Sequence, residues 1–366
     1  MFLSSFFTHN WEDALRPDWA SDIEKYRTAF EVFGMPIYWY SIMILLAVVL
    51  SVVIGYFGFA KRLGATSDHL FEGVVVGVIA GITGGRLWYV IADVLGGGKS
   101  FVQPTVIEAI KAILNLRDGG LAISGAVILA GLGVFAFCKF RKIKVLYILE
   151  IVMPLIMLSQ VLGRWGNFFN FEAHGGLINV PGLNEAIETG KLSNEVLQAQ
   201  RDFLWFLPDF IIDRMYITQH VSIAGYYHPC FFYEGVANFI GFTTYMILRR
   251  VIKKGIYVGD GIGFYLIWYG IVRFFIESMR TDAQMIGDNI PVVMVYTPIM
   301  VILGIIWLVV RRVKKIQLIT CYEALYGYNS TVLYGQEETN IKKNKKQKNK
   351  QKQQVKTEED VNNAEE

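Results

Sequence analysis

Charged residues are scarce in this sequence. They make up 18% of its 366 residues, hydrophobic residues make up 53%, and the mean hydropathy is +0.38. A soluble domain carries about 25% charged residues. The charge that is present lies in short segments between long apolar runs. This layout is typical of a polytopic membrane protein and excludes an ordinary soluble domain.

Cysteine is also rare. The three cysteines, Cys138, Cys230 and Cys321, are scattered and form no CxxC pair. Their number and spacing predict neither a disulfide framework nor a zinc site. The loop histidines have no partner at ligand spacing, and no glycine-rich nucleotide loop follows a strand. We therefore expect no metal, no cofactor and no nucleic acid partner.

Long apolar runs dominate what remains. Spanning a bilayer as a helix takes about 20 mostly apolar residues. Seven stretches meet or approach that length, at about 37–59, 71–94, 121–137, 145–162, 230–248, 262–279 and 292–310. We predict an all-α polytopic membrane protein with about seven transmembrane helices. The first residues lack a basic region, so we expect no cleavable signal peptide.

Basic residues fall in alternate loops, which predicts the orientation. Lysines and arginines follow the first, third, fifth and seventh stretches, whereas residues 281–291 contain no lysine or arginine. Because cytoplasmic loops are enriched in these residues, we expect the N-terminus outside and the C-terminus in the cytoplasm. The predicted location is the plasma membrane.

The predicted organisation has five parts. They are an outer-surface arm (1–35), helices 1–4 (36–170), an extracellular head insert (171–229), helices 5–7 (230–315) and a cytoplasmic tail (316–366). The head insert contains a helical middle at 184–201 and an aromatic stretch at 203–210. The tail is lysine-rich and expected to be disordered from about 336. A polybasic patch drawn to anionic lipids is the alternative for the tail.

Ionisable residues inside predicted spans indicate where chemistry occurs, since each costs about 2.5–3.5 kcal/mol to insert. The first such run is GRWGNFFN at 163–170, continuing to Glu172, His174 and Gly175. Arg164 and Asn167 share a helical face, and Asn170 follows closely. A guanidinium with amide donors suits a phosphodiester headgroup. An arginine that merely snorkels at a helix end is the alternative, and the tight cluster disfavours it.

The sixth predicted span carries a second polar face. Tyr269, Arg273, Glu277 and Arg280 are spaced by four, four and three residues, which places them on one side of a helix. Arg273 lies about 10 Å of helix rise inside Arg280, so we expect it to face a polar cavity. An internal Arg273–Glu277 ion pair is the alternative, and it does not exclude anion binding.

Two further places are less specific. Arg86 follows Gly84 and Gly85 in the second span, where close helix packing and a functional arginine are equally compatible with the residues. His228 precedes a proline at the start of the fifth span, a position typical of a cap or interface residue.

The run GRWGNFFN-FEAHGG resembles the signature of the prolipoprotein diacylglyceryl transferase family. WYS, GGRLWYV, DGGLAISG, HPCFFYE and YGIVRFFIESMR are similar to that family's other blocks, in the same order, over about residues 35–312. The resemblance implies seven spans, an outside-facing head and a lateral opening to the bilayer. It also implies that the diacylglyceryl group of phosphatidylglycerol is transferred to the lipobox cysteine thiol of a prolipoprotein signal peptide. A thioether forms and glycerol phosphate is released.

The resemblance also implies site residues. The catalytic set would be Tyr40, Arg164, Glu172, Tyr269 and Arg273. The phosphatidylglycerol headgroup would be bound by Arg164, Asn167, Asn170, Gly175 and Arg273. From the residues alone we add Arg86 as a headgroup contact. Further candidates are Ser124, His174, His228, Glu277 and Arg280. Ser124 stands where many members have a histidine proposed as a base, which puts a base at that position in doubt.

The proton acceptor stays open among Glu172, His174 and Tyr269. A positive field that lowers the pKa of the substrate thiol would remove the need for a base. Two other functions compete with the transferase: an anion- or lipid-handling transporter, and a lipid-binding membrane protein without catalysis. The polar residues gather in the outer half of the predicted spans and no inverted repeat is visible, which disfavours a transporter.

Overall fold

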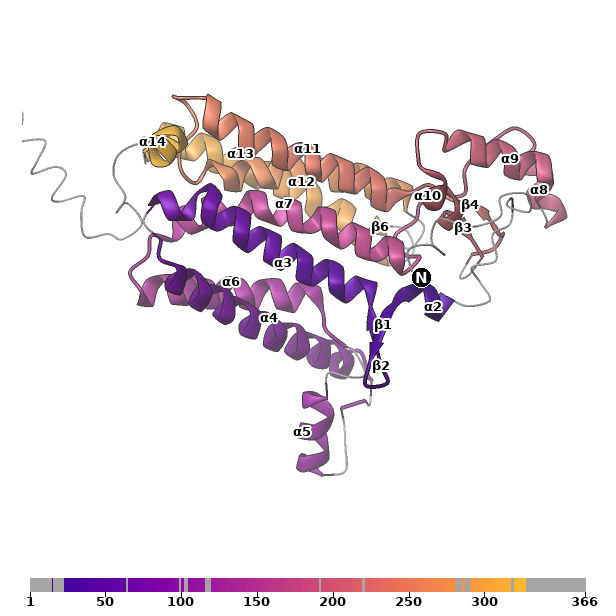
Figure 1. Cartoon of the computed structure of the whole chain (residues 1–366), viewed down its shortest axis with the longest axis horizontal. Coiled ribbons are helices and arrows are strands. Elements are labelled where there is room, and N and C mark those ends of the chain that lie inside the picture. The colour runs from indigo at the N-terminus through magenta and orange to yellow at the C-terminus, as the bar shows by residue number, and fades with distance from the viewer. Residues whose placement is uncertain are drawn as a thin grey trace, which may run out of the picture. The chain divides into compact units, whose positions relative to one another are not determined.

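The computed structural model describes residues 15, 23–63, 65–98, 100–101, 105–115, 120–190, 192–218, 221–280, 285–286, 290–316 and 319–326. These residues are mostly helical (Figure 1). Among them, six helices are long and apolar enough to cross a membrane. They are α3 (Trp39–Gly58), α4 (Ser67–Leu95), α6 (Ile123–Phe140), α7 (Val145–Phe169), α12 (Asp260–Met279) and α13 (Val292–Val313). The chain is a multi-pass membrane protein.

The six helices coincide with six of the seven predicted spans. The fifth predicted span also forms a long helix, α11 (Cys230–Val251), but it is not one of the six. Its first half contains the polar residues Glu234 and Asn238, and its last turn contains Arg249 and Arg250. The count of seven spans stays a prediction.

The chain divides into two compact units. Unit 1 comprises residues 1–53 and 150–319, and unit 2 comprises residues 54–149 and 320–366. In unit 1, α11 packs on α12 and α12 packs on α13 (Figure 1). Glycines bring α12 and α13 together: a Cβ added at Gly270 would lie 2.8 Å from Val301 Cγ2 and 3.0 Å from Thr297 O. Small residues of this kind allow close approach of helices in lipid.

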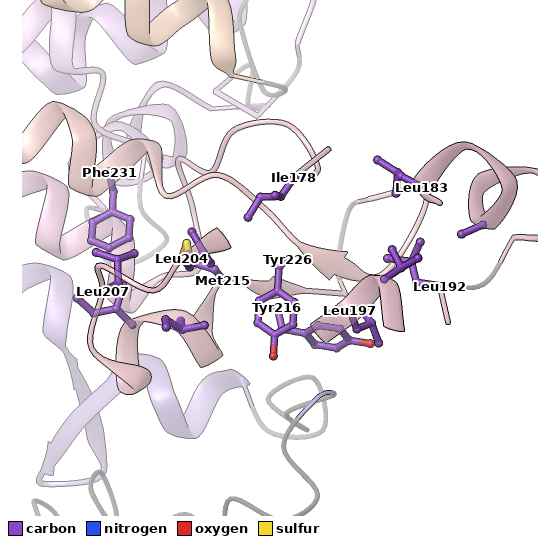
Figure 2. Close-up of a cluster of buried hydrophobic side chains, with 14 of the residues drawn as sticks. Ile178, Leu183, Leu192, Leu197, Leu204, Leu207, Met215, Tyr216, Tyr226 and Phe231 are labelled. Atoms are coloured by element: carbon purple, nitrogen blue, oxygen red, sulfur yellow. The ribbon is translucent and has the colours of Figure 1, made fainter. Parts of the chain in front are cut away.

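The head insert of unit 1 has its own hydrophobic core (Figure 2). The head insert contains three helices, α8 (Leu183–Thr189), α9 (Asn194–Phe203) and α10 (Asp209–Arg214). It also contains the strand pair β3 (Tyr216–Ile217) and β4 (Gly225–Tyr226). The predicted helical middle is therefore two helices. Gly190, with φ 72°, ends α8, and the Ser193 side chain accepts from Val196 N at the start of α9.

Residues 23–38 of unit 1 form a short helix and a hairpin, neither of which was predicted. The helix is α2 (Ile23–Arg27), and the hairpin joins β1 (Thr28–Val32) to β2 (Met35–Tyr38). Gly34 takes a φ of 74° at the turn, a conformation that glycine adopts without strain. Most of the predicted arm before residue 23 lies outside the described residues. Strands β5 (Met285–Ile286) and β6 (Ile290–Pro291) form a further pair.

In unit 2, α4 and α6 run side by side (Figure 1). The two helices approach each other most closely at Gly84 and Gly125. A Cβ added to either glycine would clash with the backbone oxygen of the other. Helix α5 (Val106–Leu114) was not predicted. Unit 2 also contains the 3₁₀ helix η2 (Ala60–Leu63) and α14 (Cys321–Tyr326). The predicted disordered part of the tail lies outside the described residues.

Candidate functional site

Three helices of unit 1 bring two arginines to one carboxylate. Helix α7 continues without interruption through the GRWGNFF run. Arg164 on α7 donates through Nη2 to Glu234 Oε1 at 2.8 Å, and Arg273 on α12 donates through Nη1 to Glu234 Oε2 at 3.0 Å. Only 1% of the Glu234 side chain is exposed. A buried carboxylate on α11 therefore fixes both guanidinium groups.

Arg273 has a second carboxylate partner. Its Nη2 lies 2.7 Å from Glu277 Oε2, one helical turn further along α12. The alternative expected for these two residues, an internal ion pair, is confirmed as a contact. Arg280 does not extend this helical face, because it is the C-cap of α12 with extended backbone (φ −83°, ψ 143°). Its backbone pairs with Gly175 instead.

Arg164 keeps more of its hydrogen-bonding capacity than Arg273. A guanidinium has five N–H donors, and in the part of the chain that the structure describes Arg164 uses one nitrogen, on Glu234. Its side chain is 17% exposed, against 9% for Arg273. The remaining donors of Arg164 can bind an anion.

Polar groups on α7 surround Arg164. The backbone oxygen of Asn170 accepts from Arg27 Nη2 at 3.0 Å. Asn167 O accepts from Glu172 N at 3.0 Å. These bonds use main-chain groups of the two asparagines, and within the described chain no hydrogen bond engages their side-chain amides. Both amides are therefore available to a ligand.

Tyr40 and Tyr269 border the same cluster from different helices. A Cβ added at Gly166 would lie 2.7 Å from Tyr40 Cδ2, so the glycine makes room for this ring. Tyr40 interacts electrostatically with Glu172 and Arg164.

Tyr269 interacts electrostatically with Glu234, Arg273 and Arg164. Its ring stacks on Tyr265, with centroids 5.6 Å apart and an interplanar angle of 4°. Gln160 Nε2 donates to the Tyr265 hydroxyl at 3.1 Å. The hydrogen-bonded pair Gln160–Tyr265 thus supports the tyrosine that faces the arginines.

The segment after α7 has an unusual backbone. Phe171 and Ala173 have φ values of 58° and 60°, a left-handed conformation that costs of order 1–3 kcal/mol for such residues. Gly175 N donates to His228 O at 2.7 Å, and Gly176 N donates to Met279 O at 2.9 Å. These bonds tie the segment to His228, two residues before the start of α11, and to Met279, the last residue of α12.

Gly175 is required by space. A Cβ there would lie 2.7 Å from Cys230 Sγ and 2.9 Å from Met279 O. Gly175 therefore has a packing role in the structure, and its role in headgroup binding stays a prediction. His174 Nδ1 lies 3.1 Å from the carbonyl oxygen of Gly175. Because a carbonyl only accepts, Nδ1 is the donor of this bond, and in the neutral form of the ring Nε2 is the acceptor.

Two basic side chains of the head region lie among aromatic rings. His228 Nδ1 is 3.4 Å from the Tyr233 hydroxyl, its ring meets Phe203 edge-on, and burial lowers its pKa. The Arg214 guanidinium lies 5.0 Å from the Phe168 ring centroid and 5.1 Å from that of Phe171. Burial lowers the pKa of Arg214 to about 10. These contacts hold the end of α7 against the head insert.

Arg86 and Ser124 belong to unit 2. Arg86 donates to the backbone oxygens of Ala112, Ile113, Asn115 and Gly120, at 2.6–3.0 Å. It thereby caps the C-terminus of α5, a structural role, and its expected headgroup contact stays a prediction. Ser124 lies exposed in the first turn of α6. Among the described residues no group of three or more His, Cys, Asp or Glu is placed to hold a metal ion.

Comparison with known proteins shows the family of this chain. Residues 27–310 match the family model described as prolipoprotein diacylglyceryl transferase. The chain belongs to this family. It is also similar to proteins named phosphatidylglycerol–prolipoprotein diacylglyceryl transferase. That of Enterococcus faecalis is 36% identical, over 78% of this chain and 90% of the relative.

Two other proteins with the same name are also similar to this chain. The protein of Bacillus cereus is 35% identical over 78% of this chain and 92% of its own length. The protein of Staphylococcus saprophyticus is 32% identical, over 78% of this chain and 89% of its own length. The match to the diacylglyceryl transferase family spans the whole of the Arg164–Glu234–Arg273 cluster.

Proposed function

We propose that this protein transfers the diacylglyceryl group of phosphatidylglycerol to the lipobox cysteine of prolipoproteins, and that it does so at the Arg164–Glu234–Arg273 cluster. Family membership carries the reaction. The observation that supports this location for the reaction is the pair of guanidinium groups held at one buried carboxylate. Such a pair is suited to a phosphodiester, which needs bidentate cations with neutral donors beside them.

The reaction forms one bond and breaks one. The cysteine sulfur attacks the glyceryl carbon that carries the phosphate, so a C–S bond forms and the C–O bond to phosphate breaks. The electron pair of that bond stays on the phosphate oxygen, and glycerol phosphate leaves. The thiol proton passes to a base of the site or to the departing phosphate. Negative charge therefore grows on the phosphate, where fixed cations stabilise it most.

The two arginines have different parts in this proposal. Arg164 retains free donors and some exposure, so it contacts the phosphate directly together with the Asn167 and Asn170 amides. Arg273 is held by Glu234 and Glu277 and supplies positive potential at the departing oxygen. Both hold the headgroup in line for attack.

Glu234 is a positioning residue in this scheme. Arg164 and Arg273 carry two positive charges, and Glu234 and Glu277 carry two negative charges, so the four groups are balanced before the lipid enters. The phosphodiester adds one negative charge and competes with Glu234 for Arg164. Glu234 keeps two like-charged side chains together while the site is empty.

Three groups around the cluster are candidates for a base that accepts the thiol proton. His174 uses Nδ1 on the Gly175 carbonyl, so in its neutral form Nε2 can accept a proton. Glu172 is exposed, and it interacts electrostatically with Tyr40. Tyr269 interacts electrostatically with both arginines. We assign Tyr40 and Tyr269 to orienting the headgroup and the thiol, and leave the proton to Glu172 or His174.

We also propose seven spans, with α11 crossing the membrane beside α12, the N-terminus outside and the C-terminus in the cytoplasm. Basic residues in alternate loops support this orientation. It places the arginine cluster towards the outer leaflet, where phosphatidylglycerol with two acyl chains can enter laterally. The five-part organisation given above follows from the same topology.

The test is an assay with purified full-length protein, labelled phosphatidylglycerol and a lipobox peptide. Label carried on the acyl chains should appear on the peptide, and label carried on the headgroup should appear in glycerol phosphate. A lipobox peptide with serine in place of cysteine should receive none. Lipid binding without transfer would support the non-catalytic alternative and overturn the proposed reaction.

A further inference from the structure

A short aromatic loop joins α9 to α10 in the head insert. It comprises residues 203–207, here called the aromatic loop, and its side chains point in two directions. Leu204 and Leu207 are 0% and 5% exposed and belong to the head's core (Figure 2). Phe203, Trp205 and Phe206 are 45%, 82% and 43% exposed. Three neighbouring exposed aromatic side chains form a patch that the core does not explain.

The loop is held in place at its base. Arg201 binds Asp209 through Nη2 at 3.1 Å and Asp213 through Nη1 at 2.5 Å. Leu204 N donates to Arg201 O at 3.0 Å, and Leu207 N donates to Leu204 O at 2.9 Å. The position of the loop, and with it the exposure of Trp205, is therefore part of the fold.

The loop lies at the end of a membrane-spanning helix. Leu204 and Leu207 share a core cluster with Phe168, in the last turn of α7, and with Phe231, in the first turn of α11. Helix α7 has 25 residues, about 37 Å at 1.5 Å per residue, which exceeds a hydrocarbon core of about 30 Å. In the orientation proposed above, on which this inference rests, the last turn of α7 therefore reaches the outer headgroup region, and the aromatic loop with it.

The loop is also continuous with the candidate site. The Phe206 ring is stacked on the Tyr233 ring with centroids 6.5 Å apart, and it lies 6.5 Å from that of Phe232. Tyr233 precedes Glu234, the carboxylate shared by the two arginines. The depth of the loop in the membrane therefore bears on the depth of the cluster.

We propose that Phe203, Trp205 and Phe206 insert into the headgroup layer of the outer leaflet and anchor the head insert there. Tryptophan is enriched at this layer because it has an apolar body and a polar N–H. A loop in bulk water would gain nothing from an 82% exposed indole. The anchor sets the start of α11 at the depth of the phosphate that the cluster binds.

The test uses full-length protein in nanodiscs of phosphatidylcholine and phosphatidylglycerol. The fluorescence of Trp205 is isolated as the difference between the wild type and Trp205→Ser. This difference signal should be quenched by lipids brominated near the headgroup end of the acyl chain and shielded from aqueous acrylamide. Trp88→Phe is the matched control, because Trp88 is 48% exposed within the span α4 and should be quenched by lipids brominated deeper in the chain.

Two results would overturn the proposal. A difference signal quenched by acrylamide and indifferent to brominated lipid would place Trp205 in water. A signal that becomes shielded only when a lipobox peptide is added would make the loop a docking surface for the peptide. Both variants must unfold thermally at the wild-type temperature within a few degrees, and Trp205→Tyr replaces Trp205→Ser if the serine variant does not.

Discussion

Glu234 and Arg273 form an ion pair of 3.0 Å between α11 and α12, and the other oxygen of the same carboxylate binds Arg164 on α7. One side chain on α11 thus joins α7 and α12. Removing one partner of a buried ion pair typically costs 3–5 kcal/mol. The buried Glu234 carboxylate is therefore stabilised by the two arginines that it binds.

Glu234→Ala should lower kcat for diacylglyceryl transfer by more than about a hundredfold, roughly 2.7 kcal/mol of barrier. Without the Glu234 carboxylate, the guanidinium groups of Arg164 and Arg273 lose the partner that fixes the distance between them. Their affinity for phosphate should not fall, because the competing carboxylate is gone, so KM for phosphatidylglycerol should stay constant or decrease. Steady-state kinetics in nanodiscs with varied phosphatidylglycerol measure both constants.

Glu150→Gln is the matched control for removing a buried carboxylate. Glu150 is 0% exposed and accepts from the Tyr245 hydroxyl and from the backbone N–H groups of Gly259 and Gly261. Its loss should lower thermal stability and leave the turnover per folded molecule near normal. A Glu234→Ala enzyme with normal kcat would show that the arginines need no positioning.

Arg273→Lys should lose most activity. Arg273 reaches Glu234 with one nitrogen and Glu277 with another, and a single ammonium cannot reproduce this planar fork. The lysine variant tests geometry, because the charge is kept. The labelled-lipid assay, normalised to folded protein in the membrane, gives the result. Near-normal turnover would remove Arg273 from the phosphate site.

The membrane helices could be predicted from the sequence because hydropathy is a local property. Boundaries such as 262–279 for α12 (Asp260–Met279) agree within two residues. The helix through Arg164 extends further than predicted, to Phe169. The hairpin at 28–38 was missed because two short strands with a Phe33–Gly34 turn leave little periodicity to detect.

The candidate site could be predicted only in part. Its charged members stood out because charge is costly in lipid, but the meeting of Glu234 with both arginines is tertiary. The support from Gln160 and Tyr265 was also missed. A signal existed, since Gln160 lies four residues before Arg164 and Tyr265 lies four before Tyr269, on the same helical faces. The capping role of Arg86 depends on α5, which was not expected.

Ser124→Ala should retain activity within about tenfold, roughly 1.4 kcal/mol of barrier. The resemblance implies that Ser124 stands where many members of the family have a histidine, and the Ser124 side chain is exposed on α6. A serine hydroxyl is a much weaker proton acceptor than an imidazole. Initial rates of peptide modification measure the effect. A loss beyond a hundredfold would show that the hydroxyl takes part in chemistry or headgroup binding.

The three cysteines should be dispensable for transfer, because the substrate brings its own thiol. Cys138, Cys230 and Cys321 are all buried and none of them forms a disulfide. Alanine at the three positions should lower stability through small cavities and leave diacylglyceryl transfer measurable by gel shift of the peptide. Abolished transfer in a folded triple variant would indicate a two-step reaction through Cys230, which packs against Gly175.

The pH dependence of stability should report on His228. Burial lowers its pKa in the folded protein, whereas the unfolded chain has a histidine pKa of about 6.5. Above that pH both states hold a neutral imidazole and the stability is complete. As the pH falls below about 6.5, the unfolded state binds a proton first, so stability is lost until the folded-state pKa is reached.

His228→Asn should therefore flatten the fall in thermal unfolding temperature between pH 7.5 and pH 5, measured by intrinsic fluorescence in detergent. Tyr233→Phe is the control: it removes the hydroxyl 3.4 Å from His228 Nδ1 and keeps the ring, so the histidine stays buried and the acid-dependent loss should persist. Carboxylates elsewhere contribute equally to the wild type and both variants, so the difference in slope isolates the histidine. Equal slopes in the wild type and His228→Asn would mean that His228 is protonated without cost in the folded state, and that its ring faces water instead of Phe203.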